Sequence, residues 1–144
     1  MEKDYQIAGH RIRFEGNESW INAVTALDGF KPFEVETKGE PAAYFVLTDE
    51  PAPQLTESQY ESGVDGFTDV FGRYQDGYLF IMTSPEGETL SLWKEQDGHI
   101  VRFNGVLTPR MVRFALWIAF GLATLPLQTI PIHTSVIQYK GRTV

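Results

Sequence analysis

The chain contains no cysteine among its 144 residues, which excludes disulfide bonds, thiolate zinc sites and cysteine nucleophiles. Basic residues are also few: 12 Lys and Arg stand against 19 Asp and Glu, and the net charge is -7. This charge, with no basic run anywhere, speaks against a surface for nucleic acid or for an anionic membrane. The missing cysteines favour a reducing compartment, and the polar N-terminus does not resemble a signal peptide. We therefore expect a soluble, cytoplasmic protein.

The sequence motifs of common enzyme classes are absent too. We find no Walker A loop, no Gly-x-Ser-x-Gly nucleophile motif and no dinucleotide-binding glycine pattern. The three histidines, His10, His99 and His133, are far apart in the sequence and form no metal-binding pair. We therefore expect neither a metal site nor a complete catalytic site in this chain.

Long apolar runs are also lacking, with one exception. Residues 114–132 carry no charge. The length of this stretch is close to the ~20 residues that a membrane-spanning helix needs. Pro126 and Pro131 interrupt this stretch, and polar residues dilute it. The sequence therefore predicts a buried helix followed by a buried strand, and no membrane span.

The first half of the chain alternates short strands with one helix. Asn17 is a suitable cap for a helix over residues 18–27, in which apolar residues recur at helical spacing. Strands are predicted over residues 5–8, 11–14, 33–36 and 43–47. Residues 49–65 are acidic, contain two prolines and show no clear period, so we expect an acidic surface loop. That loop is either simply solvated or a site for a cation or a basic partner.

The segment from Gly66 to Phe103 has the pattern of an antiparallel β-meander. Its strands are predicted over residues 67–74, 78–83, 89–94 and 100–103. The Asp-Gly pairs at residues 76–77 and 97–98 are typical of tight hairpin turns, because glycine tolerates positive φ. Alternating apolar residues in these strands indicate that at least one face of the sheet is covered.

A helix and a terminal β-hairpin are expected after the meander. Thr108 is a candidate cap and Pro109 a typical first residue for a helix ending near Ala123. This helix is apolar on every side, so it is either central in the domain or packs against a part of the protein outside this chain. A strand over residues 133–139, a turn and a second strand from Arg142 complete the hairpin.

These elements together predict an α+β fold with an antiparallel β-meander, one apolar helix and a terminal β-hairpin. We expect residues 1–107 to form a β-rich N-terminal domain. Residues 108–144 would then be a junction helix and the first strands of a further domain. The chain ends inside a strand, which suggests that the protein continues beyond Val144.

The last segment resembles a known family. Residues 125–127, 130–136 and 139–144 are similar to the lead-in to the P-loop of HPr kinase/phosphorylase-like proteins, whose fold is shared with phosphoenolpyruvate carboxykinases. The resemblance implies that a G-x-x-x-x-G-K-[ST] loop follows Val144 in a missing C-terminal kinase domain. ATP and Mg²⁺ are the cofactors implied for the full-length protein, with none bound by this segment itself. A protein or peptide substrate is implied as well.

One residue of this chain matches an active-site position of that family. His133 corresponds to the family's active-site histidine, near the transferred phosphate. Thr134 stands where family kinases that act on HPr have a glycine. The residues before Phe103 look more like the β-rich leader of HPr-kinase-related proteins of unassigned substrate.

Two hypotheses for the function follow. In the first, the chain is the non-catalytic N-terminal region of an HPr kinase-like P-loop phosphotransferase, with a structural or substrate-recruiting role. In the second, it is a stand-alone β-rich binding module for a small ligand or a peptide. The meander would then curl into a half-barrel lined by aromatic residues: Phe67, Phe71, Tyr78, Phe80 and Trp93.

Overall fold

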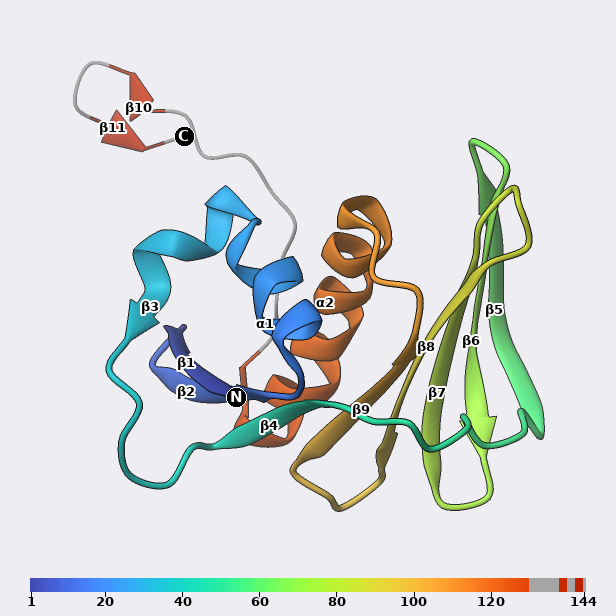
Figure 1. Cartoon of the computed structure of the whole chain (residues 1–144), viewed down its shortest axis with the longest axis horizontal. Helices are drawn as coiled ribbons and strands as arrows, with labels where there is room; N and C mark the ends of the chain where they lie inside the picture. The colour runs from blue at the N-terminus through green and yellow to red at the C-terminus, as the bar shows by residue number, and fades with distance from the viewer. Residues whose placement is uncertain (130–137, 140–141, 144) are drawn as a thin grey trace.

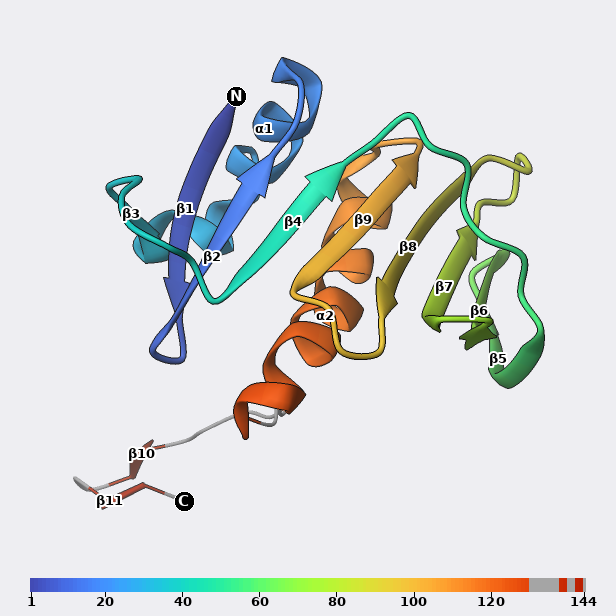
Figure 2. The same ribbon diagram turned by 90° about the horizontal axis from the view of Figure 1, so that it is seen from below.

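The protein is built around one strongly curved sheet of nine strands, with its helices on one face (Figures 1 and 2). The computed structural model describes residues 1–129, 138–139 and 142–143. The strand order is β3-β1-β2-β4-β9-β8-β7-β6-β5. The strands are β1 (Glu2–Ile7), β2 (His10–Glu15), β3 (Glu34–Val35), β4 (Ala43–Leu47), β5 (Glu57–Val64), β6 (Phe67–Tyr74), β7 (Gly77–Thr83), β8 (Thr89–Glu95) and β9 (Ile100–Gly105).

The α+β fold class predicted from the sequence is confirmed. The helices are α1 (Glu18–Thr25), α2 (Pro109–Thr124) and the 3-10 helices η1 (Asp28–Phe33) and η2 (Leu125–Leu127). Strands β6 to β9 form the predicted antiparallel meander. A separate antiparallel pair follows η2, formed by β10 (Gln138–Tyr139) and β11 (Arg142–Thr143).

Strand β4 joins the two parts of the sheet. It pairs in parallel with β2 on one side and with β9 on the other. Every other neighbouring pair in this sheet is antiparallel. Nothing in the sequence pattern predicted this central parallel arrangement, because β4 pairs with strands far from it along the chain.

The two helix caps predicted from the sequence have different outcomes. The side chain of Asn17 accepts a hydrogen bond from the backbone N–H of Trp20 at 3.0 Å, so this cap is confirmed. Pro109 is at the start of α2 as predicted, but the side chain of Thr108 makes no capping bond. The prediction of a capping hydroxyl at Thr108 was therefore wrong. Its backbone carbonyl instead accepts the N–H of Val112 at 2.9 Å.

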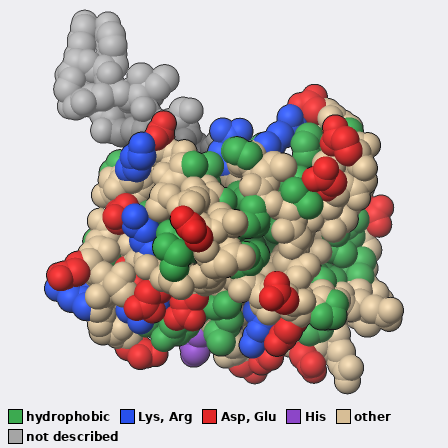
Figure 3. All heavy atoms as spheres, in the orientation of Figure 1, with side chains coloured by type: hydrophobic (Ala, Val, Ile, Leu, Met, Phe, Trp, Pro, Cys, Tyr) green, Lys and Arg blue, Asp and Glu red, His purple; other side chains and the backbone are tan. Residues whose placement is uncertain are grey.

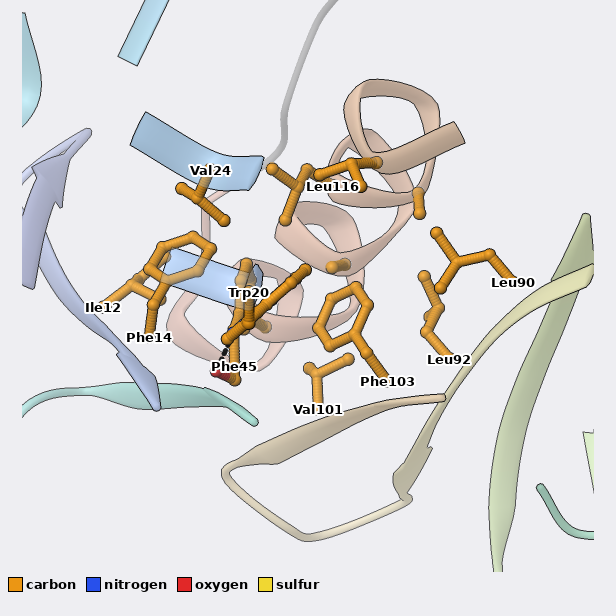
Figure 4. Close-up of a cluster of buried hydrophobic side chains, with 14 of the residues drawn as sticks. Ile12, Phe14, Trp20, Val24, Phe45, Leu90, Leu92, Val101, Phe103 and Leu116 are labelled. Carbon is orange, nitrogen blue, oxygen red and sulfur yellow. Dashed lines mark hydrogen bonds between the residues drawn. The ribbon is translucent and has the colours of Figure 1, made fainter. Parts of the chain in front are cut away.

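Side chains from both parts of the sheet and from both helices form one hydrophobic core (Figure 4). Trp20 of α1 lies at its centre, with its ring 4.8 Å from Phe103 and 5.9 Å from Phe14. The Trp20 ring N–H donates to the carbonyl of Phe45 at 3.4 Å. The buried residues of α2 belong to this same core. The predicted boundary between residues 107 and 108 stays a prediction.

The predicted acidic loop over residues 49–65 is only partly a loop. Glu57–Val64 forms strand β5, which pairs with β6 from Glu57 to Val64 with one register shift between Ser58 and Tyr60. The prediction failed because β5 is an edge strand with mostly exposed side chains, so it shows no apolar alternation. The preceding segment crosses the sheet face opposite the helices (Figure 2), where Ala52 and Leu55 pack on a small second cluster. That cluster is formed by Tyr74, Leu79 and Trp93.

The hairpin turns are present, but the two Asp-Gly glycines in them do not adopt the positive φ that the sequence analysis expected. Gly77 and Gly98 do not have positive φ. Gly77 is needed for close approach, because a Cβ there would collide with the carbonyl oxygen of Lys94. An Asp-Gly pair with positive φ does occur at Asp65-Gly66, with φ of 54° and 81°, and it connects β5 to β6; Gly87, in the predicted turn between β7 and β8, also has positive φ. This Asp-Gly pair was the sequence signal that could have revealed β5.

One stretch of the described residues is long and apolar enough to cross a membrane by length and composition alone. It runs from Pro109 to Leu127 and has a mean hydropathy of 1.3. Length and composition are weak evidence for a membrane span, since core helices of soluble proteins pass the same test.

Candidate functional site: an apolar groove between α2 and the outer strands

Helix α2 is covered by the sheet and by α1, but part of its surface remains exposed. It packs on β7, β8 and β9 through small and aliphatic side chains. These buried residues are Met111, Val112, Ala115, Leu116, Ala119 and Ala123. On another side of the helix, Phe114 and Trp117 remain 45% and 46% exposed. Large apolar side chains that stay exposed next to a concave surface commonly mark a binding site.

The exposed side of α2 and the curved outer strands form a groove of about 800 Å³. This volume lies within the range of roughly 300 to 1,000 Å³ that is usual for small-molecule sites. Hydrophobic side chains are visible on the surface between α2 and these strands (Figure 3). The groove is lined by Tyr60, Ser62, Asp69, Phe71, Phe80, Arg113, Phe114, Trp117, Ile118, Gly121, Leu122 and Leu125.

Strand register explains how the sheet wall of the groove arises. Tyr60 of β5 is paired with Phe71 of β6, which is paired with Phe80 of β7. Directly paired residues point to the same face of a sheet, so these three rings form one aromatic row. Ser62 and Asp69 are paired in the same way, two residues further along.

Helical spacing explains the opposite wall. Trp117, Gly121 and Leu125 follow one another at intervals of four residues, so they lie on one side of the helical segment. Ile118 and Leu122 lie beside them. The all-round apolar composition of α2 therefore has two uses: one side builds the core, and another side lines the groove.

The charged residues of the groove, Asp69 and Arg113, lie toward the start of α2, near Arg110, which does not line the groove. The guanidinium of Arg110 lies 4.2 Å from the ring centre of Phe67, at the beginning of β6, and is 3.2 Å from Asp65. Asp69 is two residues beyond Phe67 on the same face of β6, and Arg113 is almost one turn beyond Arg110. The remainder of the groove, toward Leu125, is apolar.

Asp69 is the most unusual of these polar residues. Its Oδ1 atom is buried and has no hydrogen-bond partner among the described residues. Burial raises the pKa of this carboxyl group, and the charge of Arg110 opposes that shift in part. A buried acceptor without a partner is costly. The groove therefore contains an unsatisfied hydrogen-bond acceptor next to apolar side chains.

The chemical groups at the groove are suited to binding. The lining provides one carboxylate, one guanidinium, one aliphatic hydroxyl and one phenol, with aromatic and aliphatic side chains around them. In the described part of the chain, no group of three or more His, Asp or Glu residues is placed to hold a metal ion.

The aromatic residues predicted to line a half-barrel are only partly brought together. Phe71 and Phe80 line the groove. Phe67 lies under Arg110, and Tyr78 stacks on Phe71 with ring centres 6.1 Å apart. Including Trp93 was wrong, because it alternates to the other face of the sheet and packs with Tyr74 and Leu79. The pairing of Leu92 with Phe80 puts Leu92, and not its neighbour Trp93, on the groove side.

Sequence reasoning missed Tyr60, Asp69 and the groove side of α2 as site residues. Tyr60 was inside the segment interpreted as a loop, so its pairing with Phe71 was hidden. Asp69 was counted within a strand without regard to its face. The sequence showed that α2 is apolar on every side, but this was explained by contact with a further domain.

The predicted catalytic residue, His133, lies outside the described residues. The other two histidines have ordinary contacts. His10 Nε2 lies 2.8 Å from the hydroxyl of Thr129, which ties the β1–β2 turn to the end of η2. His99 accepts the backbone N–H of Tyr44 through its carbonyl at 2.9 Å.

Comparisons with protein-family models, with curated proteins and with solved structures found no match to this chain.

Proposed function

We propose that this chain is a binding protein and that the groove between α2 and strands β5 to β7 holds a small, mostly apolar ligand. The observation that carries this proposal is the groove itself, about 800 Å³ in volume and walled by aromatic and aliphatic side chains. Sites of this size with few polar groups typically bury most of a small ligand. Covering exposed rings such as Trp117 supplies the hydrophobic driving force.

A single charge placed in the groove wall tests the proposal. Trp117→Glu puts a carboxylate among the apolar side chains, where a bound apolar ligand would desolvate it. We expect this variant to bind 2-methylnaphthalene or the neutral dye Nile red about tenfold more weakly than the wild type, or worse. Fluorescence titration measures both affinities.

The matched control changes an equally exposed aromatic residue outside the groove. Phe33 is 43% exposed, close to the 46% of Trp117, and is not among the groove residues. Phe33→Glu should bind both probes as tightly as the wild type. Equal affinity in Trp117→Glu, or equal loss in both variants, would refute binding in the groove.

A second candidate function is the one implied by the resemblance to HPr kinase-like proteins. We propose, as this alternative, that the chain is the non-catalytic N-terminal region of a cytoplasmic P-loop phosphotransferase that uses ATP and Mg²⁺. The pairing of β10 with β11 supports it, with Gln138 opposite Thr143. The family's lead-in has a hairpin in the corresponding place.

The sequence of the gene beyond the codon for Val144 tests this alternative. A G-x-x-x-x-G-K-[ST] loop within about ten residues supports it, and His133→Asn should then abolish phosphoryl transfer by the full-length protein. A stop codon or an unrelated domain at that place would refute it.

A further inference from the structure

The partly buried carboxylate of Asp69 indicates what kind of head group the ligand carries. Asp69 points to the same face of β6 as Phe71, and its strand neighbours are Ser62 and Met82. Its Oδ1 atom is buried without a hydrogen-bond partner among the residues that the structure describes. A ligand that donates a hydrogen bond to this oxygen would remove the cost of leaving it unpaired.

The charges around Asp69 restrict the choice of donor. Arg110 already has a counter-charge, because it pairs with Asp65 at 3.2 Å. Arg113 lines the same end of the groove, is exposed, and has no ion pair among the described residues. An ammonium head would be attracted by Asp69 and repelled by Arg113, and a carboxylate head would meet the opposite combination.

A neutral hydroxyl avoids both conflicts. It donates its proton to an acceptor such as Asp69 and can accept from a guanidinium such as Arg113 at the same time. The rest of the groove, lined by Trp117, Leu122 and Leu125 among others, takes an apolar body without a further polar partner.

We propose that Asp69 is the polar anchor of the groove and selects ligands that carry a neutral hydroxyl group on an apolar body. This proposal rests on the proposed binding function and adds the chemical class of the ligand to it.

A matched set of probes separates the body of the ligand from its head. The set is 2-methylnaphthalene without a polar head, 2-naphthalenemethanol with a neutral hydroxyl, 2-naphthylmethylamine with an ammonium, and 2-naphthoate with a carboxylate. Displacement of Nile red at pH 7 gives their affinities. We expect the alcohol to bind about tenfold more tightly than the headless probe and more tightly than either charged probe.

Variants of Asp69 then test the anchor. Asp69→Leu removes the acceptor, so the alcohol should lose about tenfold in affinity while the headless probe binds as well as before or better. Asp69→Asn keeps an acceptor oxygen and should restore most of the affinity for the alcohol. Thr68→Leu is the control, because Thr68 is the adjacent residue, points to the opposite face of the strand and is exposed.

The outcomes distinguish this inference from the binding function on which it rests. If no probe binds the wild type, the binding function itself is refuted and the anchor with it. If the headless probe binds as tightly as the alcohol and Asp69→Leu changes neither affinity, the groove stands and the anchor is refuted. Tighter binding of the amine or of the naphthoate than of the alcohol would refute the neutral head.

Discussion

At the scale of single residues, the carboxylate of Asp4 is buried and held by two arginines. It is fully buried, and Arg13 binds both its oxygens, at 2.8 and 3.1 Å. Arg11 binds it at 3.3 Å. The same arginines also donate to the backbone carbonyls of Lys38 and Gly39, at 2.7 and 3.0 Å. The network therefore fastens the segment before β4 to the β1–β2 hairpin.

Replacing this carboxylate should strongly destabilise the fold. Asp4→Asn leaves two guanidinium groups that are only 13% and 21% exposed without their counter-charge. Breaking one partner of a buried ion pair typically costs about 3 kcal/mol or more. Urea unfolding at pH 7 measures the loss. Lys38→Ala is the control: its ion pair with Glu36 is long, at 3.8 Å, and exposed, so its change should stay within about 0.5 kcal/mol.

The same residue predicts how stability responds to acid. Burial alone would raise the pKa of Asp4, but the hydrogen bond and charge of Arg13, with hydrogen bonds from the Lys38 backbone and from Arg11, outweigh it and lower the pKa from the ordinary value of 3.8. A lowered carboxyl pKa stabilises the folded state above the unfolded pKa, and this contribution is lost as the pH falls through the folded pKa. The free energy of unfolding should therefore fall below about pH 4, and less steeply in Asp4→Asn. Parallel pH curves for the two proteins would contradict this.

At the scale of elements, the two helix starts provide a direct comparison. Asn17 caps α1 through its side chain, and Thr108 makes no such bond at α2. Asn17→Ala should cost about 1 kcal/mol, whereas Thr108→Ala should cost less than half of that. Chemical denaturation of both variants tests the difference. Equal losses would mean that Thr108 caps α2 in solution.

Strand β5 shows the limit of pattern reading for an element. The next two strands in the sheet, β6 and β7, were predicted correctly because they have a buried face and therefore alternate. As an edge strand, β5 has only one partner, and all its residues except Ser62 are exposed. What makes it a strand is backbone pairing with β6, and side-chain polarity does not record that pairing.

At the scale of the whole molecule, α2 and the sheet share one core, so a defect in the helix should weaken the sheet. Leu116 is fully buried in that core, and Leu116→Ala should cost about 2 to 5 kcal/mol. Leu125→Ala is the control, because Leu125 is 55% exposed. Far-UV circular dichroism and tryptophan fluorescence should report the same, lower midpoint for Leu116→Ala. A loss of helical signal before the sheet unfolds would contradict a single core.

The sequence by itself determined the elements whose order is local. Apolar alternation and turn residues depend on consecutive positions of the chain. The sequence could therefore predict strands β4 and β6 to β9, the Asn17 cap, the extent of α2 and, with them, the α+β class. Only the tertiary structure decided what depends on residues far apart in the chain. One example is the parallel pairing of β4 with β2 and β9. Others are the position of Trp93 on the face of the sheet opposite the groove and the edge position of β5. The groove is another, because the helix and strands that form it approach one another only when the curved sheet packs around α2.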